Sequence, residues 1–268
     1  MQPLAPAEPE AAAARRTVVF EQPLNERMRS WLRLEFLYQQ AVYHNHTPNA
    51  WSSRAAVASL LEILAITGRG DARSDVLKDL ERQMAQLKDY QARPGVDTGR
   101  LRSVLTRLAQ RREELQSASS AGLARLRDSE FLAAIKHRSA IPGGTCEFDL
   151  PDYCHWLSLP PEARQADFSG WLDALRPLCD SVSDLLWVTR ENARPRREVA
   201  AGGIYQLAFD RDAPIQLLRI TLPGDSDLFP EISGSHHRCS IRFLSWVDPD
   251  NRPLQAPVDV PFVLTCCT

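Results

Sequence analysis

The spacing of the apolar residues changes partway along the chain. Up to about residue 140 they recur every three or four positions, the period of helices with one buried face, from Asn25 in the segment 20–37 and over residues 50–67, 71–92 and 98–116. Asn25 is a good N-cap for the first of these helices, and Pro94-Gly95 ends the third. A Ser-rich link and a short helix to Arg138 follow. Several helices in sequence predict a helical bundle.

Beyond residue 140 the pattern becomes extended. The turn sequence at 141–144 separates the two halves, and Pro177 is expected to interrupt the last long helix. After this turn we expect a short strand at 146–150 and helices at 151–157 and 160–192. After residue 194, glycines and prolines separate apolar runs that predict antiparallel strands at 204–209, 216–222, 238–247 and 258–267. The β-branched run at 17–20 predicts one more strand, which we expect to join that sheet.

These patterns predict an α+β protein with an N-terminal helical bundle domain and a C-terminal antiparallel β domain. The first sixteen residues are rich in Pro, Ala and Glu with almost no large apolar side chain, so we expect a disordered tail at 1–16. The other expected parts are a strand of the β domain at 17–23, the helical domain at 24–140, a junction strand and helices at 141–193, and the β domain at 194–268.

Composition and net charge indicate which classes of protein this chain can belong to. The 268 residues are 44% hydrophobic and 25% charged, as in an ordinary soluble protein that can bury a sizeable core. A formal net charge of -2 argues against a nucleic-acid-binding protein. The sequence shows no signal peptide and no apolar stretch of the roughly 18 residues that a membrane helix needs. Any site for an acidic partner must therefore be local.

The six cysteines lack the CxxC spacing of zinc sites and any secretory context, which indicates a reduced, cytosolic protein. Neighbouring residues such as Cys154-His155 and Cys266-Cys267 are the right types for zinc. Structural zinc sites, however, usually space their ligands by about two to four residues. We therefore expect no metal and no cofactor, and interpret the cysteines as small buried hydrophobes.

Enzyme patterns are weak in this chain. Ser233, Ser235 and the pair His236-His237 lack the G-x-S-x-G context of a hydrolase nucleophile, and neither glycine pair belongs to a phosphate-binding motif. Glu147 and Asp149 would share one face of a strand. Because a proline follows them, we expect hydrogen bonding in a turn at a domain junction rather than acid–base catalysis.

Residues 20–37 contain the clearest binding candidate. Arg29 and Arg33 are one helical turn apart among large apolar residues, and like charges at this spacing destabilise an isolated helix by about 0.2–0.5 kcal/mol. They are either solvated on a surface helix or a site for an acidic partner, whose carboxylates the arginine fork binds bidentately. Arg238 and Arg242 have the same spacing, and because they fall in a predicted strand they would share one face of its sheet. Arg69 and Arg73, which flank Gly70-Asp71, are a third pair.

Several motifs together resemble the ZapD family, cytosolic bacterial proteins that associate with the division ring formed by the tubulin-like GTPase FtsZ. The matching stretches are FEQPLNERMRSWLRLEFL at 20–37, GRGDARSDVLKDLERQ at 68–83, PGVD at 94–97, SAIPGGTCEFDLPDYCHWL at 139–157, ISGSHHRCSIRF at 232–243 and the closing Cys266-Cys267. Their order and spacing fit from about residue 17 to the end. The tail before Thr17 departs from the family pattern, as does 43–51, and 117–130 matches loosely.

The resemblance implies a non-enzymatic homodimer, cytoplasmic and located at the mid-cell septum, that binds the flexible C-terminal tail of FtsZ and bundles its filaments. We therefore predict a composite basic pocket between the domains for this tail. Its members would be Arg29, Arg33, Arg238, Arg242, Arg69, Arg73 and His237, with Lys136 adding charge. The structural alternative is ion pairing with Glu26, Glu35, Asp71 or Asp75. The functional alternative is a generic helical scaffold that binds another acidic partner.

Overall fold

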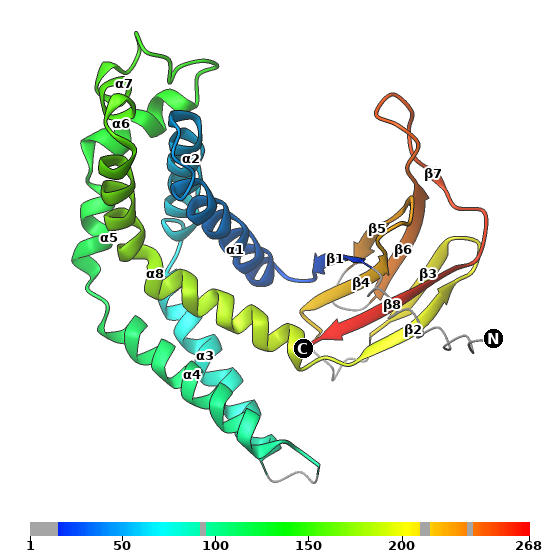
Figure 1. Cartoon of the computed structure of the whole chain (residues 1–268). Helices are drawn as coiled ribbons and strands as arrows, with labels where there is room; N and C mark the ends of the chain where they lie inside the picture. The colour runs from blue at the N-terminus through cyan, green and yellow to red at the C-terminus, as the bar shows by residue number, and fades with distance from the viewer. Residues whose placement is uncertain (1–15, 92–94, 210–214, 235–237) are drawn as a thin grey trace, which may run out of the picture. The chain divides into compact units, whose positions relative to one another are not determined.

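The chain forms two compact units in the computed structural model (Figure 1), which describes residues 16–91, 95–209, 215–234 and 238–268. The helical unit comprises Arg29–Val188, and the β unit comprises Thr189–Thr268 together with the chain up to Met28. The predicted α+β class is confirmed. Apart from Arg16, the predicted tail lies outside the described residues.

The described residues contain eight helices. They are α1 (Glu26–Asn45), α2 (Ala50–Thr67), α3 (Ala72–Tyr90), α4 (Thr98–Ser117), α5 (Ser120–Arg127), α6 (Glu130–Ser139), α7 (Pro151–Ser158) and α8 (Pro161–Glu191). The Met28 backbone N–H donates to the Asn25 side chain at 2.7 Å, so Asn25 caps α1 as predicted. Side-chain caps of the same kind begin α2 to α6, at Asn49, Asp71, Asp97, Ser119 and Ser129.

The strand expected at 146–150 is absent, because these residues form turns. All strands in the described chain belong to the β unit, so this segment has no strand beside it to pair with. Its polar groups are satisfied locally instead. The Cys146 thiol donates to the Asp149 carboxylate at 3.4 Å, and Arg138 pairs with the same carboxylate at 3.4 Å. For Asp149, the expected hydrogen bonding in a turn is confirmed.

The interruption expected at Pro177 is also wrong, because α8 is continuous through that residue. A proline inside a helix removes one backbone N–H donor. The helix nevertheless persists, because Leu175, Leu178 and Val182 are buried on its inner face, and such packing supplies most helix stability in proteins. The Ser181 hydroxyl also donates to the Pro177 carbonyl at 2.6 Å.

The helical unit has an apolar interior with a few buried polar links between helices. The Trp31 indole N–H on α1 donates to the Asp79 carboxylate on α3 at 3.0 Å, and both residues are buried. By length and composition alone, α2 is apolar enough to cross a membrane, but half of it is buried inside the unit, as in a core helix. From sequence alone, the apolar residues Leu60 and Leu64 of α2 and Leu101 and Leu108 of α4 could belong to the core or to an interface; all four are buried within the chain.

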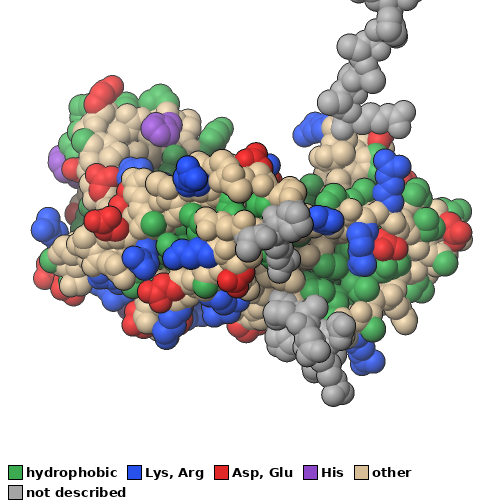
Figure 2. Space-filling view, turned by 90° about the horizontal axis from the view of Figure 1, so that it is seen from below, with side chains coloured by type: hydrophobic (Ala, Val, Ile, Leu, Met, Phe, Trp, Pro, Cys, Tyr) green, Lys and Arg blue, Asp and Glu red, His purple; other side chains and the backbone are tan. Residues whose placement is uncertain are grey.

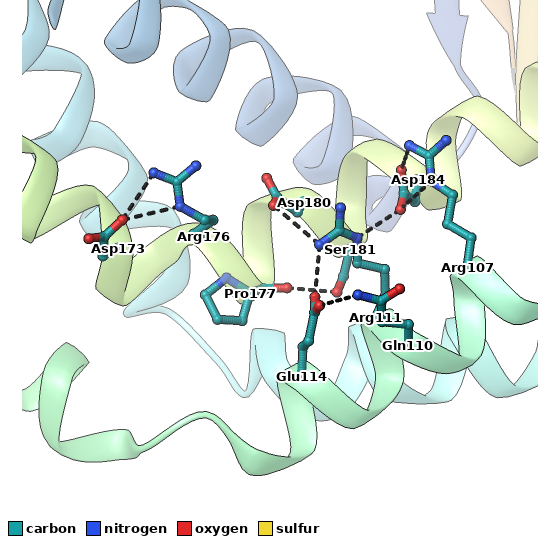
Figure 3. Close-up of polar contacts among 10 residues, drawn as sticks. All are labelled: Arg107, Gln110, Arg111, Glu114, Asp173, Arg176, Pro177, Asp180, Ser181 and Asp184. Atoms are coloured by element: carbon teal, nitrogen blue, oxygen red, sulfur yellow. Dashed lines mark hydrogen bonds and ion pairs between the residues drawn. The ribbon is translucent and has the colours of Figure 1, made fainter.

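A charged network joins α4 to α8 (Figure 3). The Asp184 carboxylate on α8 accepts hydrogen bonds from Arg107 and Arg111 on α4, each Nε lying 2.9 Å from Oδ2. Arg111 also pairs with Glu114 at 2.8 Å and with Asp180 at 3.4 Å. The Asp184 side chain is only 3% exposed, so its charge depends on these partners. The network therefore fixes how α4 packs against α8.

The β unit is a sandwich of two antiparallel sheets. One sheet has the order β1 (Thr17–Pro23), β4 (Leu217–Pro223), β8 (Val260–Cys267), β2 (Pro195–Ala200). The other has the order β3 (Ile204–Ala208), β6 (Arg238–Ser245), β5 (Leu228–Gly234), and β7 (Leu254–Gln255) also pairs with β6. The predicted joining of the first strand to the sheet is confirmed, because β1 pairs with β4. Strands β2, β5 and β7 were not predicted.

The inner faces of the two sheets meet in one hydrophobic core. Phe243 of β6 and Phe262 of β8 have ring centroids 4.9 Å apart, and both residues are buried. The chain passes from one sheet to the other at Gly202-Gly203. Gly203 has φ +75°, and a Cβ there would lie 2.4 Å from the Ala256 carbonyl oxygen. Only glycine fits this close approach without a backbone shift.

One carboxylate links β1, β4 and the end of α8 within the β unit. Glu21 on β1 accepts from Arg190 on α8 at 2.8 and 2.7 Å, and from Arg219 on β4 at 2.8 Å. All three side chains are between 20% and 28% exposed. This bridge attaches the first strand to the sheet through side chains as well as through its backbone.

Candidate functional site

The first predicted pair lies on an outward face of α1. Arg29, Arg33 and Phe36 follow one another at helical spacing, while Leu34 and Leu37 are buried on the opposite side. Arg33 is exposed, Arg29 is partly exposed, and the Phe36 ring is 63% exposed. We call these three residues the α1 basic face. It places two guanidinium groups near an exposed apolar ring.

The second predicted pair lies on β6, with both side chains on the outer face of its sheet. Arg238 and Arg242 are exposed, whereas Cys239 and Ile241, which lie between them and point to the other face, are buried. The predicted shared face is therefore confirmed. Arg242 pairs with Glu231, which lies opposite it on β5; the two side chains are 51% and 53% exposed. An exposed pair of this kind contributes only about 0–1 kcal/mol, so an incoming carboxylate can replace Glu231.

Arg238 also borders a cavity of about 720 Å³ on the same sheet. Ser233 of β5 and Gln206 of β3 line it as well. The cavity combines one cation with neutral hydrogen-bonding groups, which suits a carboxylate or a peptide backbone. His237, the remaining member of the predicted pocket from this region, lies outside the described residues.

The third predicted pair is divided between two environments. Arg69 is exposed in the turn after α2. Arg73, in the first turn of α3, donates to the Gln116 carbonyl at 2.8 Å near the end of α4. Asp71, an expected ion partner, instead caps α3 by accepting from the Ser74 backbone N–H at 3.1 Å. Arg73 thus satisfies a helix-end carbonyl, which is a structural role, although it also borders a cavity of about 500 Å³.

The pairs are distributed over both units. Arg29, Arg33, Arg69 and Arg73 belong to the helical unit, whereas Arg238 and Arg242 belong to the β unit. Their convergence on one ligand remains a prediction. Figure 2 shows one face of the protein, on which basic and acidic side chains are interspersed. This agrees with the net charge of -2 and with sites of positive charge that are small and local.

Sequence reasoning missed a basic-rimmed groove between α2, α5 and α6. Its volume is about 710 Å³, and the buried Leu61, Leu64 and Leu132 line it. Arg127, Lys136 and His137 also line it; they stand in the last turns of α5 and α6, where positive charge favours a helix end. Of these, only Lys136 was considered from sequence. The signal available was the run Lys136-His137-Arg138 directly after an apolar helix face.

The described residues contain no group of three or more His, Cys, Asp or Glu side chains that could hold a metal ion. Cys179, Cys239 and Cys267 are buried, as expected for small hydrophobes, whereas Cys146, Cys154 and Cys266 are only partly buried. Burial raises the pKa of the Cys179 thiol to about 12 and that of Cys239 to about 11. Neither thiol is therefore a ready nucleophile near neutral pH.

Comparison with known proteins identifies the family. A family model described as ZapD, cell division protein, matches residues 32–242. The chain belongs to the ZapD family. It is 39% identical to the cell division protein ZapD of Methylococcus capsulatus over 250 residues, which cover 93% of this chain and 98% of the relative. It is 37% identical to ZapD of Photorhabdus laumondii and to ZapD of Yersinia pseudotuberculosis over 251 residues, 94% of this chain and 98% of each relative.

Membership in the ZapD family confirms the resemblance and gives a role in cell division. The family match includes α1 from residue 32 onward and ends at Arg242. Arg33, both members of the pair Arg69 and Arg73, and both members of the pair on β6 thus lie within it.

Proposed function

We propose that this ZapD-family protein is a non-enzymatic division factor that binds the acidic and apolar C-terminal tail of FtsZ and, as a homodimer, cross-links FtsZ filaments. It would act in the cytoplasm at the division septum. The observation that supports the proposal best is the α1 basic face. Two arginines one turn apart, next to an exposed phenylalanine, match a peptide that carries carboxylates beside apolar side chains.

The chemistry of capture follows from these groups. Arginine binds a carboxylate through two parallel N–H groups, and a charge-assisted hydrogen bond contributes about 1.5–3 kcal/mol. Phe36 offers an apolar ring for the peptide's own apolar residues. In the proposed composite site, Arg238 and Arg242 would bind further carboxylates, with Glu231 released from Arg242. Arg69, Arg73 and His237 would contribute charge at its margin.

The expected affinity of one site is weak. Two or three charge-assisted bonds, reduced by the several kcal/mol needed to order a flexible peptide, leave a dissociation constant of about micromolar order at best. A dimer that meets a filament with many tails gains avidity from the high local concentration of the second tail. Bundling should therefore need the dimer, whereas tail binding should not, and both should weaken as salt screens the charges.

The site assignment is tested with a fluorescent FtsZ tail peptide and with light scattering of FtsZ filaments. We expect Arg33→Glu to weaken peptide binding at least tenfold and to abolish bundling, and Arg242→Glu to weaken both. Arg102→Glu is the matched control, because Arg102 is an exposed arginine on α4 outside all three pairs. If both site variants bundle like the wild type, the assignment to these arginines is wrong.

The role of the dimer is tested by dilution. Sedimentation gives the concentration at which the protein dissociates into monomers. Below it, we expect the tail peptide to bind with unchanged affinity while bundling is lost. Normal bundling by monomers would contradict cross-linking through the dimer. An absence of peptide binding at any concentration would instead contradict the proposed partner.

A further inference from the structure

The helical unit has an aromatic pocket that the proposed tail-binding site does not use. It lies at the first turn of α2, beside the turns that precede α7, and its volume is about 490 Å³. Trp51 and Phe148 line it and are 80% and 87% exposed, more than any other large hydrophobic side chain that the structure describes. Leaving two such rings in water forgoes the stabilisation that burial would give. Clustered exposed rings of this kind mark a binding surface.

The pocket carries charges of both signs. The Arg54 guanidinium carbon lies 5.7 Å from the centroid of the Trp51 ring and 5.0 Å from that of Tyr153, and one of its N–H groups donates to the Thr145 carbonyl at 2.8 Å. These contacts hold the cation in place. The exposed Glu147 lines the same pocket. A purely acidic ligand would be attracted by one residue and repelled by the other, so the pocket suits a surface that also carries one charge of each sign.

The turn that carries Phe148 is held by its own backbone. Gly144 is buried, and a Cβ there would lie 2.4 Å from the Arg138 carbonyl oxygen. Backbone N–H groups of Gly144 and Cys146 donate within the turn at 2.9 and 3.0 Å. Phe148 thus stands on an ordered turn, and little conformational entropy is lost when another surface packs on it.

A second copy of the same chain matches both features of this pocket. A two-fold axis brings the same patch of two subunits together, so every contact between two different residues is made twice. Such a patch must be self-complementary in shape and in charge. Here an exposed ring stands beside a cavity, and a cation stands beside an anion.

The rings are large enough to form much of a dimer interface. A Trp or Phe side chain buries about 150–250 Å². Two rings from each of two subunits therefore bury about 600–1,000 Å², compared with roughly 1,200–2,000 Å² in a stable protein–protein interface. The charged groups beside the rings provide the polar rim that such interfaces have.

We propose that the patch formed by Trp51, Arg54, Glu147 and Phe148 is the homodimer interface of this protein, packed on itself about a two-fold axis. Phe148 of each subunit enters the pocket of the other beside Trp51, and Arg54 of each subunit pairs with Glu147 of the other. The inference rests on the proposed homodimer and names the surface that forms it. None of the four residues belongs to the three arginine pairs, so dimer formation and tail binding can be measured separately.

The first test measures the dissociation constant of the dimer by sedimentation velocity. We expect Trp51→Ala and Phe148→Ser each to raise it at least tenfold, because each variant removes a buried ring on both sides of the axis. Trp246→Ala is the control and should change it by less than twofold, since Trp246 is 50% exposed and lies in the β unit. Circular dichroism and tail-peptide binding of all three variants should match the wild type.

The outcomes separate this interface from the proposed function. If the wild type is a dimer and both ring variants dimerise equally well, the interface is wrong while the proposed homodimer stands. A wild type that stays monomeric at every concentration overturns both. Loss of tail-peptide binding with normal dimerisation would assign the pocket to that peptide and also overturn the interface.

The second test exchanges the two charges. Arg54→Glu and Glu147→Arg should each raise the dissociation constant at least tenfold, because each variant brings like charges together in both symmetric contacts. In a mixed dimer of the two variants, both contacts again join an acidic side chain to a basic one. An equimolar mixture should therefore dimerise within threefold of the wild type. A mixture as weak as either variant alone, with both chains folded by circular dichroism, refutes the two-fold packing.

Discussion

Removing the charge of Asp184 is the most direct perturbation of the network between α4 and α8 (Figure 3). This side chain is 3% exposed and accepts hydrogen bonds from both Arg107 and Arg111. Asp184→Asn keeps the size of the side chain while removing its charge and one acceptor oxygen. Two guanidinium groups then face an amide whose NH₂ group repels their own N–H donors.

The magnitude follows from how far each partner reaches water. Breaking a buried ion pair typically destabilises a protein by about 3–5 kcal/mol, because a charge is left buried without a partner. Here the arginine side chains are 52% and 25% exposed, so both recover part of their hydration. We therefore expect a loss of about 3 kcal/mol, at the lower end of that range. Asp173→Asn is the matched control: it removes an exposed pair with Arg176 on the same helix and should cost about 0.5 kcal/mol or less.

Urea denaturation followed by far-ultraviolet circular dichroism measures both variants against the wild type. The expected result is a clearly lower midpoint for Asp184→Asn and almost no change for Asp173→Asn. If the free energies of unfolding of the two variants differ by less than about 0.5 kcal/mol, burial does not determine the strength of these ion pairs. A double variant with Arg111→Ala tests the pairing itself, because its effects should be less than additive.

Two further predictions concern pH and the β unit. Burial raises the pKa of the Cys179 thiol from 9.0 to about 12, so between these pH values the unfolded chain binds fewer protons than the native state. The free energy of unfolding should therefore fall as pH rises above 9, by up to about 1.4 kcal/mol per pH unit for this thiol. Cys179→Ala should reduce that slope in urea denaturation. An unchanged slope would rule out Cys179 as a source. Glu21→Gln removes the charge shared by Arg190 and Arg219 and should cost about 1–2 kcal/mol, measured by thermal denaturation. A variant as stable as the wild type would show that the bridge contributes nothing net.

Helix positions followed closely from sequence, because each helix has local signals. The expected helix at 50–67 coincides with α2, and side chains such as Asn25 and Asn49 cap helices within four residues of themselves. Strands were harder. The expected strand at 146–150 has a suitable local pattern, yet it forms turns because a strand needs a partner that only the fold can provide.

The same distinction applies to the binding candidates. The shared face of Arg238 and Arg242 could be predicted, since alternation along a strand is local. Their surroundings could not, because Glu231 is brought opposite Arg242 by strand pairing, and Gln116 is brought to Arg73 by helix packing. The groove lined by Leu61 and Lys136 was missed for the same reason, as its walls come from separate helices.

The sequence by itself determined the α+β class, the ZapD family and which arginines share a helix turn or a strand face. These depend on residue spacing and on interactions over a few positions, which are encoded along the chain. Only the tertiary structure decided which charges are paired, which apolar stripes are core and which exposed rings, such as Trp51 and Phe148, line one pocket. Those properties depend on which distant segments exclude water from one another, and that is fixed only when the chain packs.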